Sequence, residues 1–303
     1  MNKQKEVKGK PFLKWAGGKS QLLPTLASFL PKDLEIHKDF TYIEPFVGGG
    51  AMFFYMKQRF PHIKTIINDI NLRLIKTYIY IRNHPDKLIS RLETLEFYYR
   101  NLGDEESKKD FFLATRDRFN NSSLSDELLS AYMIFLNRTC FNGLYRENQK
   151  GKFNVPFGKY NNPKICDPEL IINDSYLLRN TTILHGDYAE TSKYVTKNSF
   201  FYFDPPYRPL NSTSSFTSYV KEVFNDNEQL RLKQYFEFLS NEGCFCLLSN
   251  SDCRGKDGND TFFDNLYENF LIERILAKRT INANPRKRGH ITELLIRNYK
   301  KTL

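Results

Sequence analysis

The sequence lacks the cysteine and histidine patterns that mark metal sites and disulfide scaffolds. Its five cysteines form no C-x-x-C pair and no even set for disulfides, and no histidine cluster accompanies them. We therefore expect reduced cysteines, no bound metal ion and a cytoplasmic location. Cys244 and Cys246 alternate within an apolar run, where small buried hydrophobic side chains are the commoner case.

Long apolar runs are also missing. No uninterrupted span reaches the roughly 18 apolar residues that a membrane helix needs. The lysines of residues 1–10 are not followed by an apolar core of signal-peptide length. These absences argue against membrane insertion and secretion.

Positive charge is in excess. The 303 residues include 45 Lys and Arg against 35 Asp and Glu, a net charge of +10 with a pI near 9.2. Such a balance suits a polyanionic partner such as nucleic acid, although a basic enzyme without such a partner would have the same charge. A hydrophobic content of 40% is enough for a full α/β core and a smaller subdomain.

The hydrophobic pattern predicts a discontinuous α/β domain. Strands are expected at 41–45, 64–68, 181–185, 199–203, 244–249, 270–275 and 291–298, and helices at 51–59, 71–82, 188–195, 225–240 and 260–268. Between 86 and 180 this alternation lapses into polar helices near 86–98, 105–119 and 126–137, followed by a loop-rich tract. We expect a doubly wound sheet built from residues 1–85 and 181–303, with 86–180 as an inserted, mainly helical subdomain.

The most informative segment is Asp204-Pro205-Pro206-Tyr207, which follows the apolar run 200–203. It places a carboxylate, the carbonyls of a rigid prolyl segment and an aromatic ring at a strand end. Adenine N6 is a poor nucleophile because its lone pair is delocalised into the ring. Hydrogen bonds from N6–H to Asp204 and to a prolyl carbonyl would draw the lone pair out of conjugation, while Tyr207 stacks on the base. An isolated D-P-P-Y is as often an ordinary turn, so the neighbouring motifs decide.

A glycine turn indicates a nucleotide-type crevice. The run Thr41–Pro45 reads as a buried strand, and Phe46-Val47-Gly48-Gly49-Gly50 leads into a helix. Glycines such as Gly48 let the backbone approach a ligand, and Glu44 can accept a hydrogen bond from an ammonium group. Asp69 ends the next strand, a position that binds ribose hydroxyls in Rossmann-like folds. The dinucleotide spacing G-x-G-x-x-G is absent, so a cationic methionyl tail fits this turn better.

The segment Pro11–Ser20 contains Gly18-Lys19-Ser20 and resembles a phosphate loop at first sight. A phosphate loop requires a glycine five residues before Gly18, and that position is Leu13. The nucleotide triphosphatase interpretation therefore fails.

Taken in order, F-L-K-W-A-G-G-K, E-P-F-V-G-G-G, N-D-I-N and D-P-P-Y resemble the Dam/DpnM family of DNA adenine-N6 methyltransferases. The likeness extends through the segments 137–148, 151–160 and 288–293 and so covers nearly the whole chain. It implies a Rossmann-like methyltransferase sheet whose last strand is antiparallel, with S-adenosylmethionine as the methyl donor. It also implies methylation of adenine within GATC in double-stranded DNA.

The resemblance assigns further site residues. The positions that match its cofactor contacts are Trp15, Lys19, Asp69 and Asp204, and Glu44, Phe46 and Gly48 of the glycine turn are further candidates. Asp187 follows a strand end that resembles the family's motif near the cofactor adenine and is a secondary cofactor contact. Because an adenine in a duplex cannot reach such a pocket, the base must be flipped out. The family places Asn142 and Leu144 near the target pair, and Leu144 is otherwise an ordinary core residue. Lys14 matches a guanine-reading position.

Further basic residues suit contacts with DNA. Arg146 can present its guanidinium fork to guanine N7 and O6. Arg138, Lys152 and Lys159 are either phosphate contacts or solvated surface. The stretch containing Arg286, Lys287 and Arg288 is either a solvated loop or, as we expect here, a clamp on the DNA backbone.

Two other classes of protein remain open at this stage. An RNA or protein methyltransferase could use the same cofactor fold and a similar D-P-P-Y segment. A DNA-binding module without catalysis is disfavoured, because binding alone does not require Asp204 beside a cofactor crevice. A restriction endonuclease that cuts the same site is a possible partner.

Overall fold

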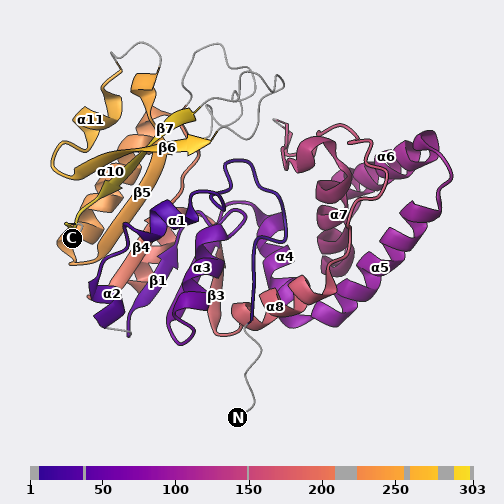
Figure 1. Cartoon of the computed structure of the whole chain (residues 1–303), viewed down its shortest axis with the longest axis horizontal. Coiled ribbons are helices and arrows are strands. Elements are labelled where there is room, and N and C mark those ends of the chain that lie inside the picture. The colour runs from indigo at the N-terminus through magenta and orange to yellow at the C-terminus, as the bar shows by residue number, and fades with distance from the viewer. Residues whose placement is uncertain are drawn as a thin grey trace. The chain divides into compact units, whose positions relative to one another are not determined.

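The computed structural model describes residues 7–36, 39–148, 150–208, 224–255, 260–278 and 290–300. They contain a seven-stranded sheet whose hydrogen-bonded neighbours follow the order β3-β2-β1-β4-β5-β7-β6 (Figure 1). The strands are β1 (Thr41–Glu44), β2 (Lys64–Asp69), β3 (Thr181–His185), β4 (Ser199–Phe203), β5 (Phe245–Ser251), β6 (Leu271–Lys278) and β7 (His290–Arg297). Strands β2, β1, β4 and β5 pair in parallel, and β7 is antiparallel to both β5 and β6. The predicted Rossmann-like sheet with an antiparallel last strand is confirmed.

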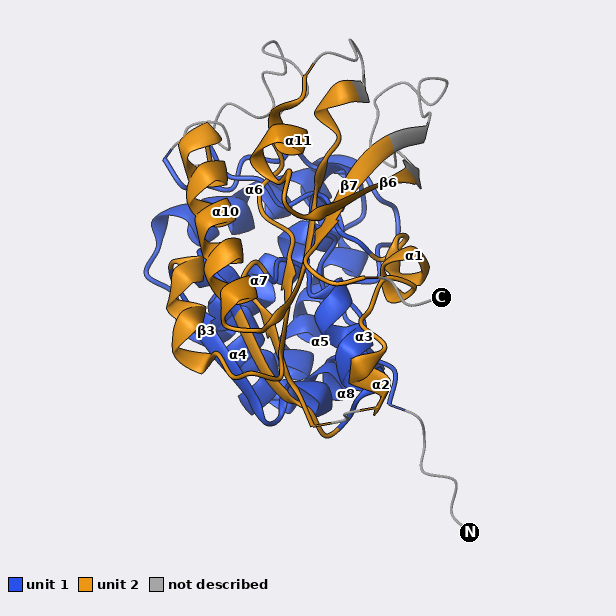
Figure 2. Ribbon diagram, turned by 90° about the vertical axis from the view of Figure 1, so that its left-hand side faces the viewer, with its two compact units in different colours: residues 1–19, 47–61, 68–186 blue, residues 20–46, 62–67, 187–303 orange. Residues whose placement is uncertain are grey.

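The chain divides into two compact units, shown in different colours in Figure 2. Unit 1 comprises residues 1–19, 47–61 and 68–186. Its helices are α3 (Ala51–Arg59), α4 (Leu72–Asn83), α5 (Pro85–Asn101), α6 (Glu105–Asn121), α7 (Asp126–Thr139), the short η1 (Phe141–Gly143) and α8 (Pro168–Leu178). Within it, α4 packs against α5, α7, α8 and β3. The predicted insertion 86–180 lies inside unit 1, and its boundaries as a recognition subdomain stay a prediction.

Unit 2 comprises residues 20–46, 62–67 and 187–303. Its helices are α1 (Leu23–Ala27), α2 (Asp33–Ile36), η2 (Tyr188–Tyr194), α10 (Asp226–Asn241), η4 (Cys253–Gly255) and α11 (Phe262–Leu266). Strand β4 is buried along its whole length, as expected for a parallel strand that is covered on both faces. Burying each of its aromatic side chains contributes roughly 1.5–3 kcal/mol. This strand is therefore a firm base for the Asp204 segment that follows it.

Two expectations about secondary structure are corrected. The tract after residue 139 is not only loop, because it contains α8, whose N-terminus is capped by the Asp167 side chain with Pro168 in the first turn. An Asp-Pro start is a recognised helix signal that the hydrophobic pattern alone did not reveal. The helix expected at 188–195 is a 3-10 helix, η2, and starts with Asp187 accepting from the Ala189 N–H.

The buried carboxyl of Asp174 on α8 predicts a pH dependence of stability. Its Oδ1 accepts the Lys10 N–H at 3.1 Å, and burial holds the pKa of Asp174 well above its usual range. Because the pKa is higher in the folded chain, the protonated Asp174 carboxyl stabilises the fold fully below the unfolded-state pKa of about 3.9. This stabilisation is lost as pH rises through the folded-state pKa. An asparagine side chain cannot ionise, so Asp174→Asn does not lose this stabilisation. The free energy of unfolding of the variant, relative to that of wild type, should therefore rise by at most about 1.4 kcal/mol per pH unit above pH ~4.

Thermal unfolding of both proteins between pH 4 and 8 checks this expectation. Asp110→Asn makes the same chemical change at an exposed position of α6 and serves as the control. Parallel melting curves for wild type and Asp174→Asn across this range would contradict a protonated Asp174 in the folded chain.

Candidate functional site

The glycine turn of unit 1 is held by hydrogen bonds to its backbone. Gly48 has φ +46°, its N–H donates to Asp69 Oδ2 at 3.0 Å, and its carbonyl accepts from the Tyr78 hydroxyl at 2.9 Å. Gly50 has φ +75° and begins α3, and a Cβ there would lie 2.5 Å from the Tyr78 hydroxyl. The turn therefore requires glycine at both positions.

Asp69 is the residue that anchors this turn. Its Oδ2 is occupied by Gly48, and its Oδ1 accepts the N–H of Asn71 at 2.9 Å. Burial raises the pKa of Asp69, and these two N–H groups partly oppose the rise. Carboxylate oxygens each have two acceptor sites, so a ribose hydroxyl remains compatible with this arrangement. The ribose contact stays a prediction, and Asp69 now has a structural role as well.

Trp15 and Lys19 lie on the segment that precedes the turn in the chain. The Trp15 ring packs on Gly48, where a Cβ would come within 2.9 Å of it, and stacks on Tyr145 at a centroid distance of 5.0 Å. Lys19 is buried, and its Nζ donates to the Gly17 carbonyl at 2.6 Å. The structure thus brings Trp15, Gly48 and Asp69 together within unit 1.

In unit 2, Glu44 is the last residue of β1 and Asp204 directly follows β4, which is the neighbouring parallel strand. Strand β1 pairs with β4 in parallel, with Ile43 opposite Phe201, so both acids emerge at the carboxyl edge of the sheet. Glu44 is only 2% exposed and accepts the Tyr42 hydroxyl at 2.6 Å. Burial and this carboxylate hold the pKa of Tyr42 well above its usual range. Asp204 accepts a hydrogen bond from Ser249 Oγ on β5 at 3.1 Å.

The segment after Asp204 is fixed by side chains from distant elements. The Tyr207 hydroxyl donates to Glu293 Oε2 on β7 at 2.8 Å, and Gln229 Nε2 donates to the Pro206 carbonyl at 3.3 Å. Burial, followed by the carboxylates of Asp204 and Glu293, holds the pKa of Tyr207 well above its usual range. The Tyr207 ring therefore has a fixed orientation, and its stacking on a base stays a prediction.

Arg208 fastens the end of this segment. Its guanidinium pairs with Asp226 at 2.8 Å and with Asp260 at 2.5 Å, and it lies 4.3 Å from the centre of the Phe262 ring. Sequence reasoning gave no role to Arg208, Ser249 or Glu293. The pairing of β4 with β5 brings Ser249 to Asp204, and the pairing of β5 with β7 brings Glu293 to Tyr207.

Asp187 and Phe46 have neighbours of their own in unit 2. Asp187 accepts both terminal nitrogens of Arg231 at 2.7 and 2.8 Å, and this pairing lowers the pKa of Asp187. Phe46 lies 5.1 Å from the Tyr188 ring and 5.8 Å from the Phe224 ring, measured between centroids. Phe46 thus belongs to an aromatic cluster with Tyr188 and Phe224, and the cofactor contacts of Phe46 and Asp187 stay predictions.

Asn137 connects two backbone segments of unit 1 that carry predicted DNA contacts, the segment of Lys14 and the segment of Asn142 and Leu144. Its side chain accepts the Lys14 N–H and donates to the Lys14 and Gly143 carbonyls, all within 2.9 Å. Beside Gly143, Asn142 is exposed with φ +59° and Leu144 is half-buried. The neighbouring Phe141 side chain is 53% exposed, and sequence reasoning did not single it out.

Arg146 lies in an irregular hairpin. Cys140 pairs with Phe157 and Glu147 with Phe153 as antiparallel bridges. The Arg146 Nε donates to Asn154 Oδ1 at 2.8 Å, which sets the plane of the guanidinium. The loop-rich tract of the sequence is therefore an ordered support for Arg146.

The other predicted DNA contacts differ in exposure. Arg138 is half-buried and donates to the Phe12 carbonyl at 2.9 Å, and burial lowers its pKa. Lys159 is exposed and pairs with Glu105 at 2.7 Å. Arg286, Lys287 and Arg288 lie outside the described residues. None of these contacts with DNA is tested by the fold.

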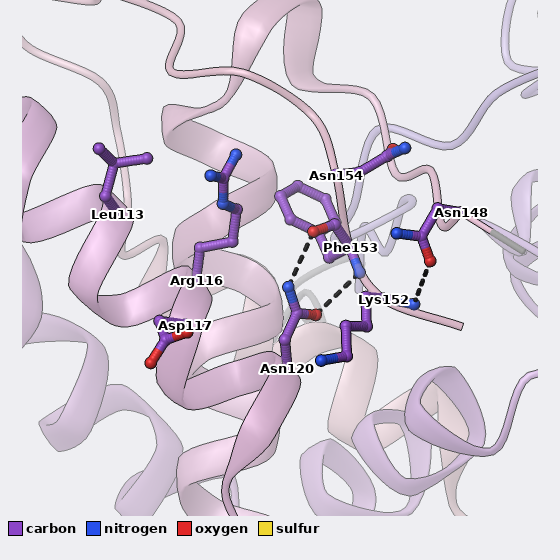
Figure 3. A pocket seen from close by; sticks show the side chains of 8 residues that line it. All are labelled: Leu113, Arg116, Asp117, Asn120, Asn148, Lys152, Phe153 and Asn154. Carbon is purple, nitrogen blue, oxygen red and sulfur yellow. Dashed lines mark hydrogen bonds between the residues drawn. The ribbon is translucent and has the colours of Figure 1, made fainter. Parts of the chain in front are cut away.

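A hollow of about 380 Å³ opens beside the hairpin in unit 1 (Figure 3). Its lining consists of Leu113, Arg116, Asp117, Asn120, Asn148, Lys152, Phe153 and Asn154. Asn120 of α6 holds the hairpin at this hollow, because its side chain accepts the Phe153 N–H at 2.8 Å and donates to the Phe153 carbonyl at 2.9 Å (Figure 3). The predicted cofactor-binding residues are not part of this lining, so the hollow belongs to the support of the hairpin.

The part of the chain that the structure describes contains neither a metal-binding cluster nor a membrane-spanning helix. Among the described residues, no group of three or more His, Cys, Asp or Glu side chains could hold a metal ion. Within the same residues, no helix is long and apolar enough to span a bilayer.

The strand order defines a doubly wound α/β protein of the Rossmann-like class. A family model described as D12 class N6 adenine-specific DNA methyltransferase matches residues 15–281. The chain belongs to this family, which confirms the predicted family and enzyme class.

Three relatives illustrate the relationship. The type II methyltransferase M.MjaIII of Methanocaldococcus jannaschii is 50% identical over 96% of this chain and 99% of its own length. The type II methyltransferase M1.LlaDCHI of Lactococcus lactis is 38% identical over 96% of this chain and 95% of its own length. A DNA adenine methylase of Vibrio cholerae is 34% identical over 95% of both chains.

Proposed function

We propose that this protein transfers a methyl group from S-adenosylmethionine to N6 of a flipped adenine within GATC in double-stranded DNA. The observation that carries the proposal is Asp204, which emerges at the end of β4 and is hydrogen-bonded by Ser249. The D-P-P-Y segment around it is held by Glu293 and Gln229, so its polar groups are pre-positioned.

The donor set of the chain suits S-adenosylmethionine. The cofactor supplies a methyl group activated on a positively charged sulfur, next to an ammonium, a carboxylate and a ribose. Acidic side chains at the predicted positions, Glu44 and Asp69 among them, match the cationic groups and the ribose hydroxyls, and the Lys19 ammonium matches the carboxylate. The tight turn at Gly48 lets the backbone approach such a ligand.

The chemistry proposed for Asp204 is the activation of N6. The carboxylate accepts one N6–H, and a carbonyl of the prolyl segment Pro205–Pro206 accepts the second. The N6 lone pair then forms the new bond to the methyl carbon, while the electron pair of the breaking carbon–sulfur bond stays on sulfur. The surplus proton on N6 leaves afterwards, with Asp204 as its nearest acceptor. No covalent enzyme intermediate is required.

The residues of the proposed DNA surface have two tasks: some read bases, and others fill the space that the flipped adenine leaves in the duplex. Lys14 and Arg146 read guanines, and Asn142 and Leu144 occupy the space left by the flipped base. The exposed Phe141 ring adds an apolar side chain of the kind that inserts between base steps. Arg138 and Lys159 are proposed phosphate contacts, in keeping with the net charge of +10.

The cellular setting is also a proposal. We place the protein in the cytoplasm of a bacterial or phage-infected cell, acting at the nucleoid. A restriction endonuclease that cuts the same site is a proposed partner, in line with the type II names of two relatives.

Labelled methyl transfer tests the function. Duplexes containing GATC, duplexes in which the adenine pair alone is exchanged, and RNA of the same sequence are incubated with the protein and methyl-labelled S-adenosylmethionine. We expect label only in the GATC duplex, recovered as N6-methyladenine after digestion. Equal labelling of all adenine-containing duplexes would remove GATC as the site, and labelling of RNA alone would contradict DNA as the substrate.

A further inference from the structure

Tyr145 contacts two parts of unit 1 that the proposed function assigns to different ligands. Its ring stacks on Trp15 with an interplanar angle of 11°, and Trp15 lies against Gly48 in the proposed cofactor turn. The next residue, Arg146, is the proposed guanine reader. Adjacent residues of one segment thus face the cofactor side and the DNA side.

The hydroxyl of Tyr145 extends this connection toward the hairpin, because it donates to Glu147 Oε1 at 2.5 Å. On the other side, the Trp15 ring that stacks on Tyr145 packs on Gly48, whose N–H donates to Asp69 Oδ2 at 3.0 Å. Glu147 Oε1 lies 3.5 Å from Arg73. A continuous set of contacts therefore links Asp69 and Trp15 to Glu147 and Arg73.

Arg73 carries the connection into the hairpin. Its guanidinium donates to the Gly151 carbonyl at 3.3 Å and lies 4.5 Å from the centre of the Phe119 ring on α6. The Tyr145 ring itself is buried and lies 5.6 Å from the Phe153 ring. Because packed side chains of this kind do not deform continuously, a shift of Trp15 requires Tyr145 and the hairpin backbone to shift as well.

We propose that Tyr145 is a positioning residue that couples occupation of the cofactor site to the orientation of the DNA-recognition hairpin. Cofactor and cognate duplex then each strengthen the binding of the other, by the same factor in both directions. The inference rests on the proposed function, because it takes Trp15 and Asp69 as cofactor contacts and Arg146 as a base reader.

A pair of variants separates the ring of Tyr145 from its hydroxyl. Tyr145→Phe keeps the stack on Trp15 and removes the hydrogen bond to Glu147, whereas Tyr145→Leu removes the stack as well as the hydrogen bond. The matched control is Tyr99→Phe, which deletes a hydroxyl that donates to the Tyr160 carbonyl at 3.3 Å in the same unit. The ligands are a GATC duplex and sinefungin, an analogue of S-adenosylmethionine without a transferable methyl group.

Calorimetry of each ligand in the presence and absence of the other gives the coupling factor. Wild type and Tyr99→Phe should show a factor in the range of roughly 5–150 that is typical of coupled sites. We expect the factor to fall at least about threefold in Tyr145→Phe and to approach one in Tyr145→Leu, while each ligand alone binds with little change.

Fluorescence provides a second, independent measurement, because Trp15 is the only tryptophan in the chain. Adding the GATC duplex should change the Trp15 emission in wild type and in Tyr99→Phe, and much less in Tyr145→Phe. Direct contact between DNA and Trp15 would preserve the change in Tyr145→Phe, which would contradict coupling through the hydroxyl.

The outcomes are distinguishable. A wild-type coupling factor of one, or a factor that both Tyr145 variants leave unchanged, overturns the inference alone. Equal losses of both affinities at a constant factor would show a merely structural Tyr145 and overturn it too. If Tyr145→Leu does not fold, Tyr145→Phe decides the matter. A wild-type protein that binds neither ligand overturns the proposed function itself.

Discussion

Replacing Asp204 with Ala is expected to slow methyl transfer by a factor of about 10²–10⁴, the contribution of a positioned acid or base. The variant loses the carboxylate that holds N6 and keeps the surrounding fold, because β4 is buried independently of it. Single-turnover rates with saturating cofactor and GATC duplex measure the loss directly. Circular dichroism and the melting temperature should stay close to those of wild type.

Two further variants sharpen this prediction. Asp33→Ala makes the same substitution at an exposed position of α2 and should leave the rate unchanged. Ser249→Ala removes the hydroxyl that donates to Asp204 at 3.1 Å, so it should give a smaller loss than Asp204→Ala. A rate for Asp204→Ala within about tenfold of wild type would place the activating group elsewhere.

Much of the fold followed from local sequence patterns. The strands at 181–185 and 199–203 and the helix at 51–59 have the expected bounds, because each has a continuous apolar run or a clear start beside turn residues. Helix α8 was missed although it buries Leu170, Ile171, Leu177 and Leu178, because the Asp-Pro start was not taken as a helix signal. The position of β7 between β5 and β6 depends on long-range pairing that no local pattern contains.

The sequence predicted the acidic residues of the candidate site, but not the residues that hold this site in place. Asp69 ends β2 and Asp204 follows β4, and strand ends are where doubly wound sheets place ligands. Ser249 and Glu293 lie 45 and 86 residues away from the groups that they bind, Asp204 and Tyr207. The position of Ser249 is fixed by the register of β4 and β5, in which Phe203 lies opposite Leu248, and that of Glu293 by the register of β5 and β7, in which it lies opposite Ser251. Such register is not visible in a single sequence.

The same distinction applies to the recognition segment. Its basic residues could be identified by type, because an arginine fork matches a guanine edge. The bond from Arg146 to Asn154 depends on a hairpin that pairs residue 147 with residue 153 and was not expected from the loop-rich composition. Sequence therefore supplied a candidate reader, and the fold supplied the reason for its fixed orientation.

Replacing Arg146 with Ala should cost about 1–3 kcal/mol of discrimination at one guanine of the site. The Nε bond to Asn154 sets the guanidinium plane, so the loss should fall on one base pair and not on all DNA equally. The measurement compares methylation rates on GATC and on each singly substituted duplex at two salt concentrations. The exposed Lys159 provides the contrast, because loss of a phosphate contact in Lys159→Ala should weaken binding to every sequence and reduce the salt slope by about one. Equal losses on all duplexes for Arg146→Ala, with a reduced salt slope, would make Arg146 a backbone contact and leave the guanine to another reader.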